Sequence, residues 1–291
     1  MRIRVVLLAG VLLLAAAGCG GQSRARAERV EAARSGEPPG EPRRAEPRPP
    51  PPGRIDCGLA DCVSLTFDDG PGKHTERLLD ILKAAHVRAT FFVLGEMVEE
   101  RPQVVRRMVL EGHEVANHSW SHRDLTGLSP AGVRSQIRRT QQAVKRASGV
   151  EPTLMRPPYG ATDAKVARAA GMPQILWSVD TLDWRHRDAD RGAKVGISEP
   201  GRGGIVLYHD IHKPTVDCIP RVIRGLKKRG FTLVTVGELF QGERLEPGET
   251  YTERDGGTGR LSASPTPPGS RAGAPDGSRE PSGRGTAPRA R

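Results

Sequence analysis

Between residues 63 and 236, apolar runs of strand length alternate with longer segments of helical pattern, and this alternation limits the fold more than any other feature. The runs are Val63–Phe67, Ala89–Leu94, Gln174–Val179, Ile205–Tyr208 and Phe231–Val236. Strands that alternate with helices pair in parallel, because each helix returns the chain to the edge where the previous strand began. The pattern predicts an α/β domain, and periodicity alone fits either an open doubly wound sheet or a reduced (β/α) barrel.

Local signals mark the ends of two expected helices. Ser129 followed by Pro130 is typical of a helix start, because the serine hydroxyl caps the first turn and proline needs no backbone donor there. The stretch 219–229 ends at Gly230, which suits the left-handed residue that often follows a helix. Both signals support the alternation of strands and helices.

Composition divides the chain into one globular domain and two polar ends. Residues 1–18 combine two arginines with a following apolar run, which is typical of an export signal and too short to span a bilayer comfortably. Residues 19–54 are rich in proline and arginine, and residues 242–291 in glycine, proline, serine and arginine, so neither segment can offset the entropy of ordering. We expect a disordered stalk, a folded domain over residues 55–241 and a disordered tail.

Cys19 directly follows Ala-Ala-Gly, which resembles a bacterial lipobox, where the cysteine becomes a lipid-modified N-terminus. Ala16 stands where a larger aliphatic residue is usual, so an ordinary signal-peptidase site beside an incidental cysteine is the alternative. Both interpretations place the domain outside the cytoplasm. The first predicts a lipid anchor at Cys19 in the bacterial cell membrane, with the domain at its extracellular face or in the cell wall.

Export also bears on the other cysteines. Cys57 and Cys62 are separated by four residues just before the first apolar run, and an oxidising compartment favours a disulfide between them. Cys218 then stays unpaired. We therefore expect one disulfide at the start of the domain.

The formal net charge of +11 is spread along the whole chain. Such a charge favours approach to an anionic wall or membrane surface. No basic run is interleaved with aromatic residues, which make up only 4% of the chain, so the sequence gives nucleic-acid binding no support. We interpret the basic residues as a solvated surface.

Groups of acidic, basic or imidazole side chains follow directly after apolar runs. They are Asp68-Asp69, Arg156, Asp180 to Trp184, and His209-Asp210. In parallel α/β folds the C-terminal ends of the strands lie at one edge, where the loops carry the chemistry. The sequence therefore predicts one site to which all four groups contribute.

Asp68 and Asp69 form the densest group, and Gly70-Pro71 turns the chain away directly after them. Neighbouring carboxylates repel each other unless positive charge lies nearby, and a metal ion supplies it. His118 and His122 are four residues apart, so their rings meet on one side of a helical turn or tight loop. One aspartate and two histidines leave open positions on an ion, as catalytic zinc sites do, and zinc is our first choice. Taken alone, the aspartates fit a helix cap and the histidines a surface position equally well.

Five motifs occur together and in order, and in this the sequence resembles the polysaccharide deacetylases of the NodB homology domain, also called carbohydrate esterase family 4. They read TFDDGP, HSWSH, RPPYG, DTLDW and IVLYHD, and they begin at Thr66, His118, Arg156, Asp180 and Ile205. The resemblance covers residues 62–240, and no motif departs at a key position. It implies the family's deformed (β/α) barrel, a single domain with its groove at the C-terminal ends of the strands.

The resemblance also implies a role for each motif residue. It makes Asp69, His118 and His122 the metal ligands, and Asp68 the general base that deprotonates the attacking water. Arg156 resembles the family's arginine that holds the base carboxylate. A plain structural ion pair is the alternative for Arg156.

The later motifs supply the proton donor and the substrate contacts. His209 matches the family's general acid, and Asp183 matches the carboxylate that orients its ring and raises its pKa. The backbone N–H of Tyr159 corresponds to the donor that binds the oxyanion, and Trp184 and Leu207 to the apolar contacts of the acetyl methyl group. Ordinary core positions are the alternative for these side chains.

The resemblance implies metal-dependent removal of N-acetyl groups from an amino-sugar polymer, with release of acetate. Location favours the N-acetylglucosamine residues of peptidoglycan, because an exported, tethered enzyme meets the cell wall first. A chitin or chitooligosaccharide deacetylase and an acetylxylan esterase are the alternatives within the family. A catalytically silent wall-binding protein is the alternative of another class, and the intact Asp68, Arg156 and His209 argue against it. We expect a glycan polymer as the partner and a monomeric protein.

Overall fold

The computed structural model describes residues 55–254. The expected export signal, Cys19 and the expected stalk lie outside these residues, and so does the expected tail beyond residue 254. Within residues 55–254, no helix has the length and apolar character that crossing a membrane requires.

The strands of this region are short, and every strand ladder is parallel. The strands are β1 (Cys62–Asp68), β2 (Thr90–Val93), β3 (Glu114–Asn117), β4 (Gln174–Ile175), β5 (Val179–Asp180), β6 (Ile205–His209), β7 (Thr232–Val234) and β8 (Thr250–Tyr251). One sheet has the order β3-β2-β1-β6-β5, with β7 paired to the first residues of β1, and β4 pairs with β8. The parallel order confirms the α/β class that the sequence predicts.

Single-residue bridges join the two sheets into an incomplete barrel. Met155 bridges Asn117 at the end of β3 and Gln174 at the start of β4, so it takes the place of a strand between them. Gly204, directly before β6, bridges Glu253, which follows β8. The wall therefore runs from β6 through β1, β2 and β3 to β4 and β8 and returns to β6. This is the deformed (β/α) barrel that the family resemblance implied.

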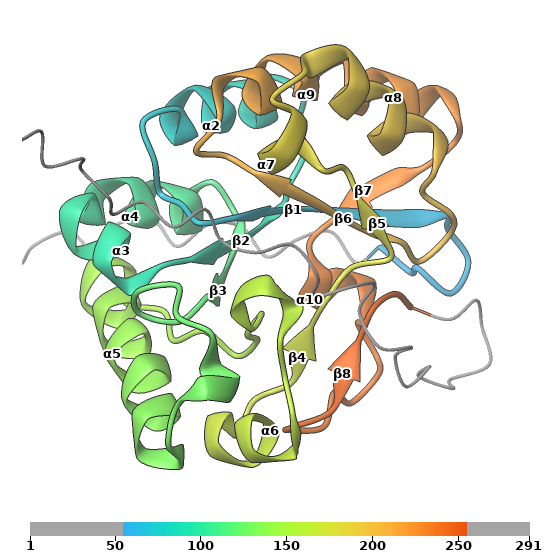
Figure 1. Ribbon diagram of the computed structural model, residues 1–291. Coiled ribbons are helices and arrows are strands. Elements are labelled where there is room, and N and C mark those ends of the chain that lie inside the picture. The colour runs from blue at the N-terminus through green and yellow to red at the C-terminus, as the bar shows by residue number, and fades with distance from the viewer. Residues whose placement is uncertain (1–54, 255–291) are drawn as a thin grey trace, which may run out of the picture. The chain divides into compact units, whose positions relative to one another are not determined.

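Helices cover the outside of this wall, with α2, α8 and α9 together over β1 and β6, and α3, α4 and α5 beside β2 and β3 (Figure 1). The helices are α2 (Thr75–Ala84), α3 (Gly95–Glu100), α4 (Pro102–Leu110), α5 (Pro130–Ser148), α6 (Ala164–Ala170), α7 (Asp183–His186), α8 (Ala189–Ser198), α9 (Lys213–Lys228) and α10 (Val236–Leu239). Ser129 caps α5 by accepting a hydrogen bond from the Gly132 N–H. Gly230 follows the end of α9 with a φ of 90°. Both predicted helix ends are confirmed.

Alternation along β1 separates the residues that form the core from those that reach the barrel interior. Val63, Leu65 and Phe67 belong to the hydrophobic cluster between the sheet and the outer helices. Thr66 and Asp68 point the other way, because successive side chains of a strand lie on opposite faces. Both accept hydrogen bonds from Arg156 inside the barrel. One strand thus supplies core packing on one face and site residues on the other.

The expected strands at 63–67, 89–94, 205–208 and 231–236 are confirmed as β1, β2, β6 and β7, with ends that differ by one or two residues. The expected single strand at 174–179 is wrong, because this stretch forms two short strands, β4 and β5. The backbone N–H of Leu176 donates to Tyr251, whereas that of Ser178 donates to Ile205. The chain therefore changes its pairing partner from β8 to β6 within this run.

The expected domain end at residue 241 is also wrong. Tyr251 is only 1% exposed, and its ring centroid lies 5.7 Å from that of Phe240. The backbone N–H of Gln174 donates to the carbonyl of Glu249 at 2.8 Å. Large apolar residues are sparse in this segment, but the open edge of β4 offers backbone groups that a further strand satisfies. The domain therefore includes residues 242–254.

The predicted disulfide between Cys57 and Cys62 is confirmed, and Cys218 is a free, buried cysteine. The disulfide lies at the start of β1, at the opposite end of the strand from Asp68. Burial raises the pKa of the Cys218 thiol to about 12. Neither feature belongs to the expected site.

Candidate active site

Loops at the C-terminal ends of the strands converge on one site. Asp69 follows β1, His118 follows β3, Arg156 follows the Met155 bridge, and His209 ends β6. Residues with a side chain and a positive φ gather in these loops, namely Asp69 (71°), Ser119 (72°), His122 (54°), Tyr159 (62°) and Leu182 (53°). Such backbone persists only where the surrounding structure holds it, and it is typical of functional sites.

The predicted metal ligands lie together. Asp69, His118 and His122 each offer one ligand atom, and these atoms lie within 4.8 Å of one another. The Oδ1 atom of Asp69 lies 3.5 Å from Nε2 of His118 and 3.4 Å from Nε2 of His122. Two ligand atoms of one tetrahedral zinc ion, each about 2.0–2.1 Å from it, are about 3.4 Å apart. The spacing of the three side chains therefore fits a divalent metal ion.

The hydrogen bonds and protonation of these side chains also suit a cation. The Nδ1–H of His118 donates to the Arg156 carbonyl at 2.8 Å, which leaves the Nε2 lone pair directed toward Asp69. Burial lowers the pKa of His118 to about 3, so its ring is neutral near pH 7. The Asp69 Oδ1 atom is buried and has no hydrogen-bond partner within residues 55–254. A cation between these atoms would satisfy that oxygen.

Asp68 lies beside the metal-ligand cluster, with Oδ2 3.7 Å from Nε2 of His118. Its other carboxylate oxygen accepts a hydrogen bond from Nη1 of Arg156 at 2.7 Å. Burial raises the pKa of Asp68, and the positive charge of Arg156 opposes that rise. The ion pair therefore favours an ionised Asp68, as a general base requires.

Arg156 has no exposed surface and is held from both walls of the barrel. Its Nη1 also donates to Thr66 of β1 at 2.9 Å. On the opposite wall, Nε donates to the carbonyl of Ile175 at 2.9 Å and Nη2 to that of Leu176 at 2.7 Å. The guanidinium lies 4.0 Å from the ring centroid of Phe92. With its donors used in this way, Arg156 fixes the position of Asp68.

His209 is the second candidate for proton transfer. The pairing of β1 with β6 places it directly beside Asp68. Its Nδ1–H donates to Oδ1 of Asp183 at 2.9 Å, and Oδ2 of Asp183 accepts the Thr215 hydroxyl at 2.6 Å. Burial alone would lower the pKa of His209, but the hydrogen bond and charge of Asp183 raise it to about 9. The imidazole is therefore protonated near pH 7 and has its Nε2–H available.

The three predicted substrate-contact residues differ in exposure. Tyr159 is 65% exposed, Trp184 is 46% exposed and Leu207 is 3% exposed. The Tyr159 ring packs edge-on against His122 with centroids 4.5 Å apart, and Leu207 lies on β6 two residues before His209. Tyr159 is thus placed at the metal-ligand cluster, and the substrate contacts of all three stay predictions.

Sequence reasoning missed two residues that support the site. Thr66 binds Arg156, and Thr215 binds Asp183. Thr66 lies two positions before Asp68, so strand alternation could have placed it on the same face. No comparable signal exists for Thr215, which reaches the site from the first turn of α9.

The site combines a metal-ligand cluster, a carboxylate paired with Arg156 and a protonated imidazole. The carboxylate can accept a proton from attacking water, and the imidazole can protonate a leaving group. A divalent ion would polarise a carbonyl oxygen. Together these parts suit hydrolysis of an amide or an ester.

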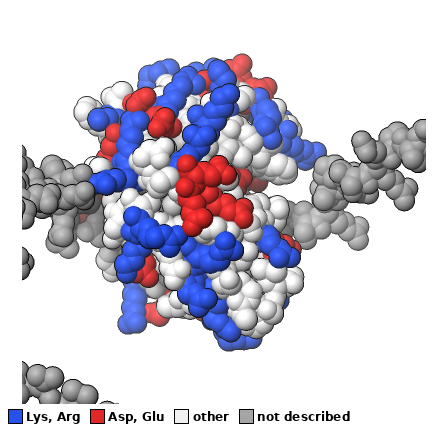
Figure 2. Space-filling view, turned by 90° about the vertical axis from the view of Figure 1, so that its left-hand side faces the viewer, with Lys and Arg blue, Asp and Glu red and all other residues white. Residues whose placement is uncertain are grey.

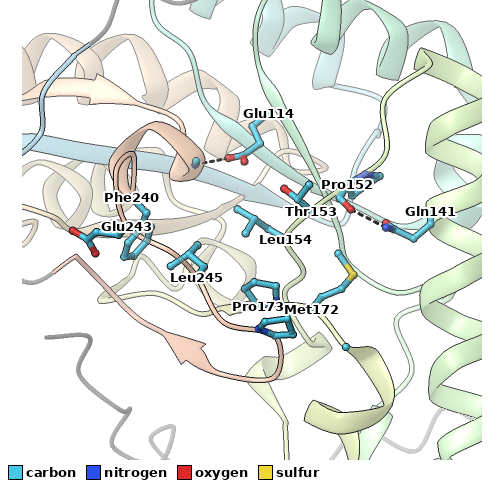
Figure 3. Close-up of a pocket in the computed structure, with 13 residues that line it drawn as sticks. Glu114, Gln141, Pro152, Thr153, Leu154, Met172, Pro173, Phe240, Glu243 and Leu245 are labelled. Carbon is cyan, nitrogen blue, oxygen red and sulfur yellow. Dashed lines mark hydrogen bonds between the residues drawn. The ribbon is translucent and has the colours of Figure 1, made fainter. Parts of the chain in front are cut away.

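A separate pocket of about 470 Å³ contains none of these catalytic candidates (Figure 3). Its lining includes Glu114, Leu154, Pro173 and Phe240. Glu114 begins β3, whereas His118 follows the end of that strand. The pocket therefore lies at the opposite end of the sheet from the candidate active site.

Charge on the surface is mixed. On the face shown in Figure 2, acidic side chains form a central group, with lysine and arginine side chains above and below it. The positive charge of the chain is therefore not gathered into one continuous patch on this face.

The comparisons with known proteins agree on one family. A family model described as polysaccharide deacetylase matches residues 56–175. The peptidoglycan-N-acetylglucosamine deacetylase PgdA of Listeria monocytogenes is 46% identical over 193 residues, which are 66% of this chain and 41% of that protein. The peptidoglycan-N-acetylmuramic acid deacetylase PdaC of Bacillus subtilis is 42% identical over 178 residues, which are 61% of this chain and 38% of that protein. The chain thus spans about two fifths of the length of these two relatives.

A solved structure extends the likeness to the fold. The structure of T48 deacetylase with substrate is 44% identical in sequence and superposes with a TM-score of 0.67. The match covers 68% of this chain and 99% of that one. Sequence and fold therefore point to the same family.

Proposed function

The chain belongs to the polysaccharide deacetylase family, and on that basis we propose that it removes acetyl groups from the N-acetylglucosamine residues of peptidoglycan. The observation that carries the proposal is the placement of Asp68 beside His209, next to the cluster of Asp69, His118 and His122. The names of PgdA and PdaC support peptidoglycan as the polymer.

Zinc is the metal that we propose for Asp69, His118 and His122. Three protein ligands of nitrogen and oxygen type, with positions left open, are typical of catalytic zinc. When bound, the ion would polarise the acetyl carbonyl and make water more acidic. The neutral His118 ring and the unpartnered Asp69 oxygen support this choice of ligands.

Asp68 begins the proposed reaction by accepting a proton from water, whose oxygen forms a bond to the acetyl carbon. The backbone N–H of Tyr159 donates to the carbonyl oxygen as negative charge develops on it. His209 then gives its proton to the amide nitrogen as the C–N bond breaks. The products are acetate and a free amine on the sugar, and Trp184 and Leu207 contact the acetyl methyl group.

Two supporting residues keep the proton-transfer groups in the required states. Arg156 holds Asp68 ionised and aimed at the water. Asp183 orients the His209 ring and keeps it protonated. An amine leaves poorly without a proton, so the raised pKa of His209 serves the second half of the reaction.

We also propose that the enzyme works as a monomer outside the bacterial membrane. Residues 1–18 would direct export, Cys19 would carry the lipid anchor, and residues 19–54 would link the anchor to the domain. Replacing Cys19 with alanine should release the protein from the membrane fraction, while retention would contradict lipid attachment. Light scattering of residues 55–254 measures the molar mass in solution and so tests the proposed monomeric state.

The deciding experiment measures acetate release by residues 55–254 from purified peptidoglycan, chitooligosaccharides and acetylxylan. Each substrate is tested with chelator and again after zinc is restored. Zinc-dependent release from peptidoglycan is the expected result. Release only from chitooligosaccharides or acetylxylan would keep the proposed mechanism and change the substrate to that polymer. No release from any of them, together with binding to cell walls, would favour a silent wall-binding protein.

A further inference from the structure

Asp210 is a buried carboxylate to which the proposed reaction gives no role. It directly follows His209, and its side chain has no exposed surface. Its Oδ1 atom is buried without a hydrogen-bond partner among residues 55–254. Burying a carboxylate with so few donors is costly, so its presence beside the site calls for an explanation.

The carboxylate of Asp210 packs against the turn that follows β1. The Thr75 hydroxyl donates to Oδ2 of Asp210 and accepts the backbone N–H of Gly72 at 2.7 Å. A Cβ atom added to Gly70 would lie 2.6 Å from Oδ1 of Asp210, so only glycine fits there. On its other side, the Gly70 carbonyl accepts the Leu94 N–H at 3.0 Å. Asp210 thus fixes this turn from the β6 side.

The turn presents the metal ligand Asp69, which directly precedes Gly70. Asp69 has a φ of 71°, a conformation that a residue with a side chain keeps only when its surroundings hold it. Its Oδ1 atom must face His118 and His122 at about the distances recorded, 3.5 Å and 3.4 Å. Contacts that fix Gly70 and Gly72 therefore also fix the direction of the Asp69 carboxylate.

The charge of Asp210 also interacts with that of the metal ligand Asp69. Burial raises the pKa of Asp210 to about 7, and the charge of Asp69 adds to the rise although the Thr75 hydrogen bond opposes it. Two carboxylates that repel each other in a buried site are relieved by a cation placed among them. The strongest effect of Asp210 should thus appear when a divalent cation binds.

We propose that Asp210 is a positioning residue of the metal site, which fixes the turn that carries Asp69 and adds buried negative charge that strengthens cation binding. The inference rests on the proposed function, because it takes Asp69, His118 and His122 as the ligands. Asp210 itself touches neither the substrate nor the reacting atoms in this scheme.

The experiment measures zinc affinity by competition with a chromophoric chelator, using residues 55–254. Asp210→Asn removes the charge and keeps the shape, and Thr75→Val removes the hydrogen bond and keeps the charge. Glu114→Gln is the matched control, because Glu114 also accepts a hydrogen bond from a threonine hydroxyl, that of Thr90 at 2.8 Å. Glu114, which is labelled in Figure 3, lies at the other end of the sheet. Burial raises the pKa of Glu114 as well.

Asp210→Asn should weaken zinc binding about 10–100-fold, as the loss of groups that orient metal ligands does. Thr75→Val should weaken it less, and Glu114→Gln should leave it unchanged. The metal-free Asp210→Asn protein should melt no lower than the wild type, because it has lost a carboxylate whose charged form burial disfavours. Saturating zinc should restore its acetate release, because the substitution changes the affinity for the ion and leaves the reacting groups in place.

The inference is overturned if Asp210→Asn binds zinc as tightly as the wild type, or if Glu114→Gln weakens binding equally. Should Asp210→Asn fail to fold, Thr75→Val decides, and wild-type affinity in that variant overturns the inference. A wild-type protein that binds no zinc would instead contradict the proposed metal site itself.

Discussion

The two ends of the parallel sheet turn the chain in different ways. Where strands begin, the residues with positive φ are mostly glycines, such as Gly112 before β3 and Gly203 before β6, which have no side chain to strain, and His86 before β2 is an exception. Where strands end, the residues with positive φ are Asp69, Ser119, His122, Tyr159 and Leu182. Each of these costs of order 1–3 kcal/mol and must be held by its neighbours. The strain is therefore concentrated at the catalytic end.

Buried ionisable groups differ between the ends in the same sense. At the catalytic end, Arg156 pairs with Asp68, and His209 pairs with Asp183. At the other end, burial holds His113 neutral, with its pKa lowered to about 4. The catalytic end of the barrel therefore keeps charged groups in buried pairs, whereas burial keeps His113 uncharged at the other end.

The sharpest test of this comparison replaces the two neighbouring aspartates at the catalytic end. Asp68→Asn should lower the rate of acetate release about 10²–10⁴-fold and keep zinc, because it removes only the base. Asp69→Ala should lose zinc and activity together. Activity assays and zinc titrations check both variants, and equal zinc loss in the two would overturn the division of their roles.

At the end of the sheet where the strands begin, His113 should make the free energy of unfolding depend on pH in the acid range. His113 has a pKa of about 4 in the fold and 6.5 as its ordinary value, so the unfolded chain binds the proton more readily. The free energy of unfolding should therefore fall as pH drops from 6.5 toward 4, by up to about 3 kcal/mol from this residue. Urea unfolding at several pH values measures it. His113→Gln should remove that part of the slope, and an unchanged slope would contradict this assignment.

Truncation tests whether residues 242–254 belong to the stable part of the domain. A chain that ends at residue 241 loses the buried Tyr251 ring and should be less stable by at least about 2–3 kcal/mol than one that ends at residue 254. Thermal and denaturant unfolding of the two chains provide the comparison. Equal stability would return the domain end to residue 241.

The smallest predicted effect is a shift in the dependence of kcat/KM on pH. Asp183→Asn removes the charge that raises the pKa of His209, so the alkaline limb of kcat/KM should move to lower pH by about one unit or more. The rate should therefore fall earlier as pH rises. An alkaline limb that stays in place would mean that another group donates the proton.

Sequence alone could predict the elements that carry their own apolar signal. The strands β2, β6 and β7 contain continuous apolar runs, β1 alternates apolar with polar residues, and the ends of α5 and α9 bear capping residues. The strand β3 was missed, because Glu114 and Asn117 leave only two apolar residues within it. Glu114 is held by Thr90 and Asn117 by the Ile137 carbonyl, and both partners are distant in sequence. Such strands exist because of tertiary contacts that no local pattern records.

The site was predicted more fully than the fold around it. Asp69, His118 and His122 are motif residues, and the structure brings them together as expected. The motif identifies residue types but not their surroundings, so Asp210 was grouped with His209 without a role, and the supporting Thr215 gave no signal of its own. Whether a given carboxylate is ionised also depends on burial and on neighbours from other strands.

The last described strand has a consequence for the order in which the site is assembled. The Tyr251 carbonyl accepts the Leu176 N–H at 2.8 Å, the Leu176 carbonyl accepts Nη2 of Arg156 at 2.7 Å, and Arg156 holds Asp68 at 2.7 Å. A chain that emerges N-terminus first therefore contains all five motifs some forty residues before it contains this support. Full activity should appear late in synthesis and export, when residues 250–251 pair with β4.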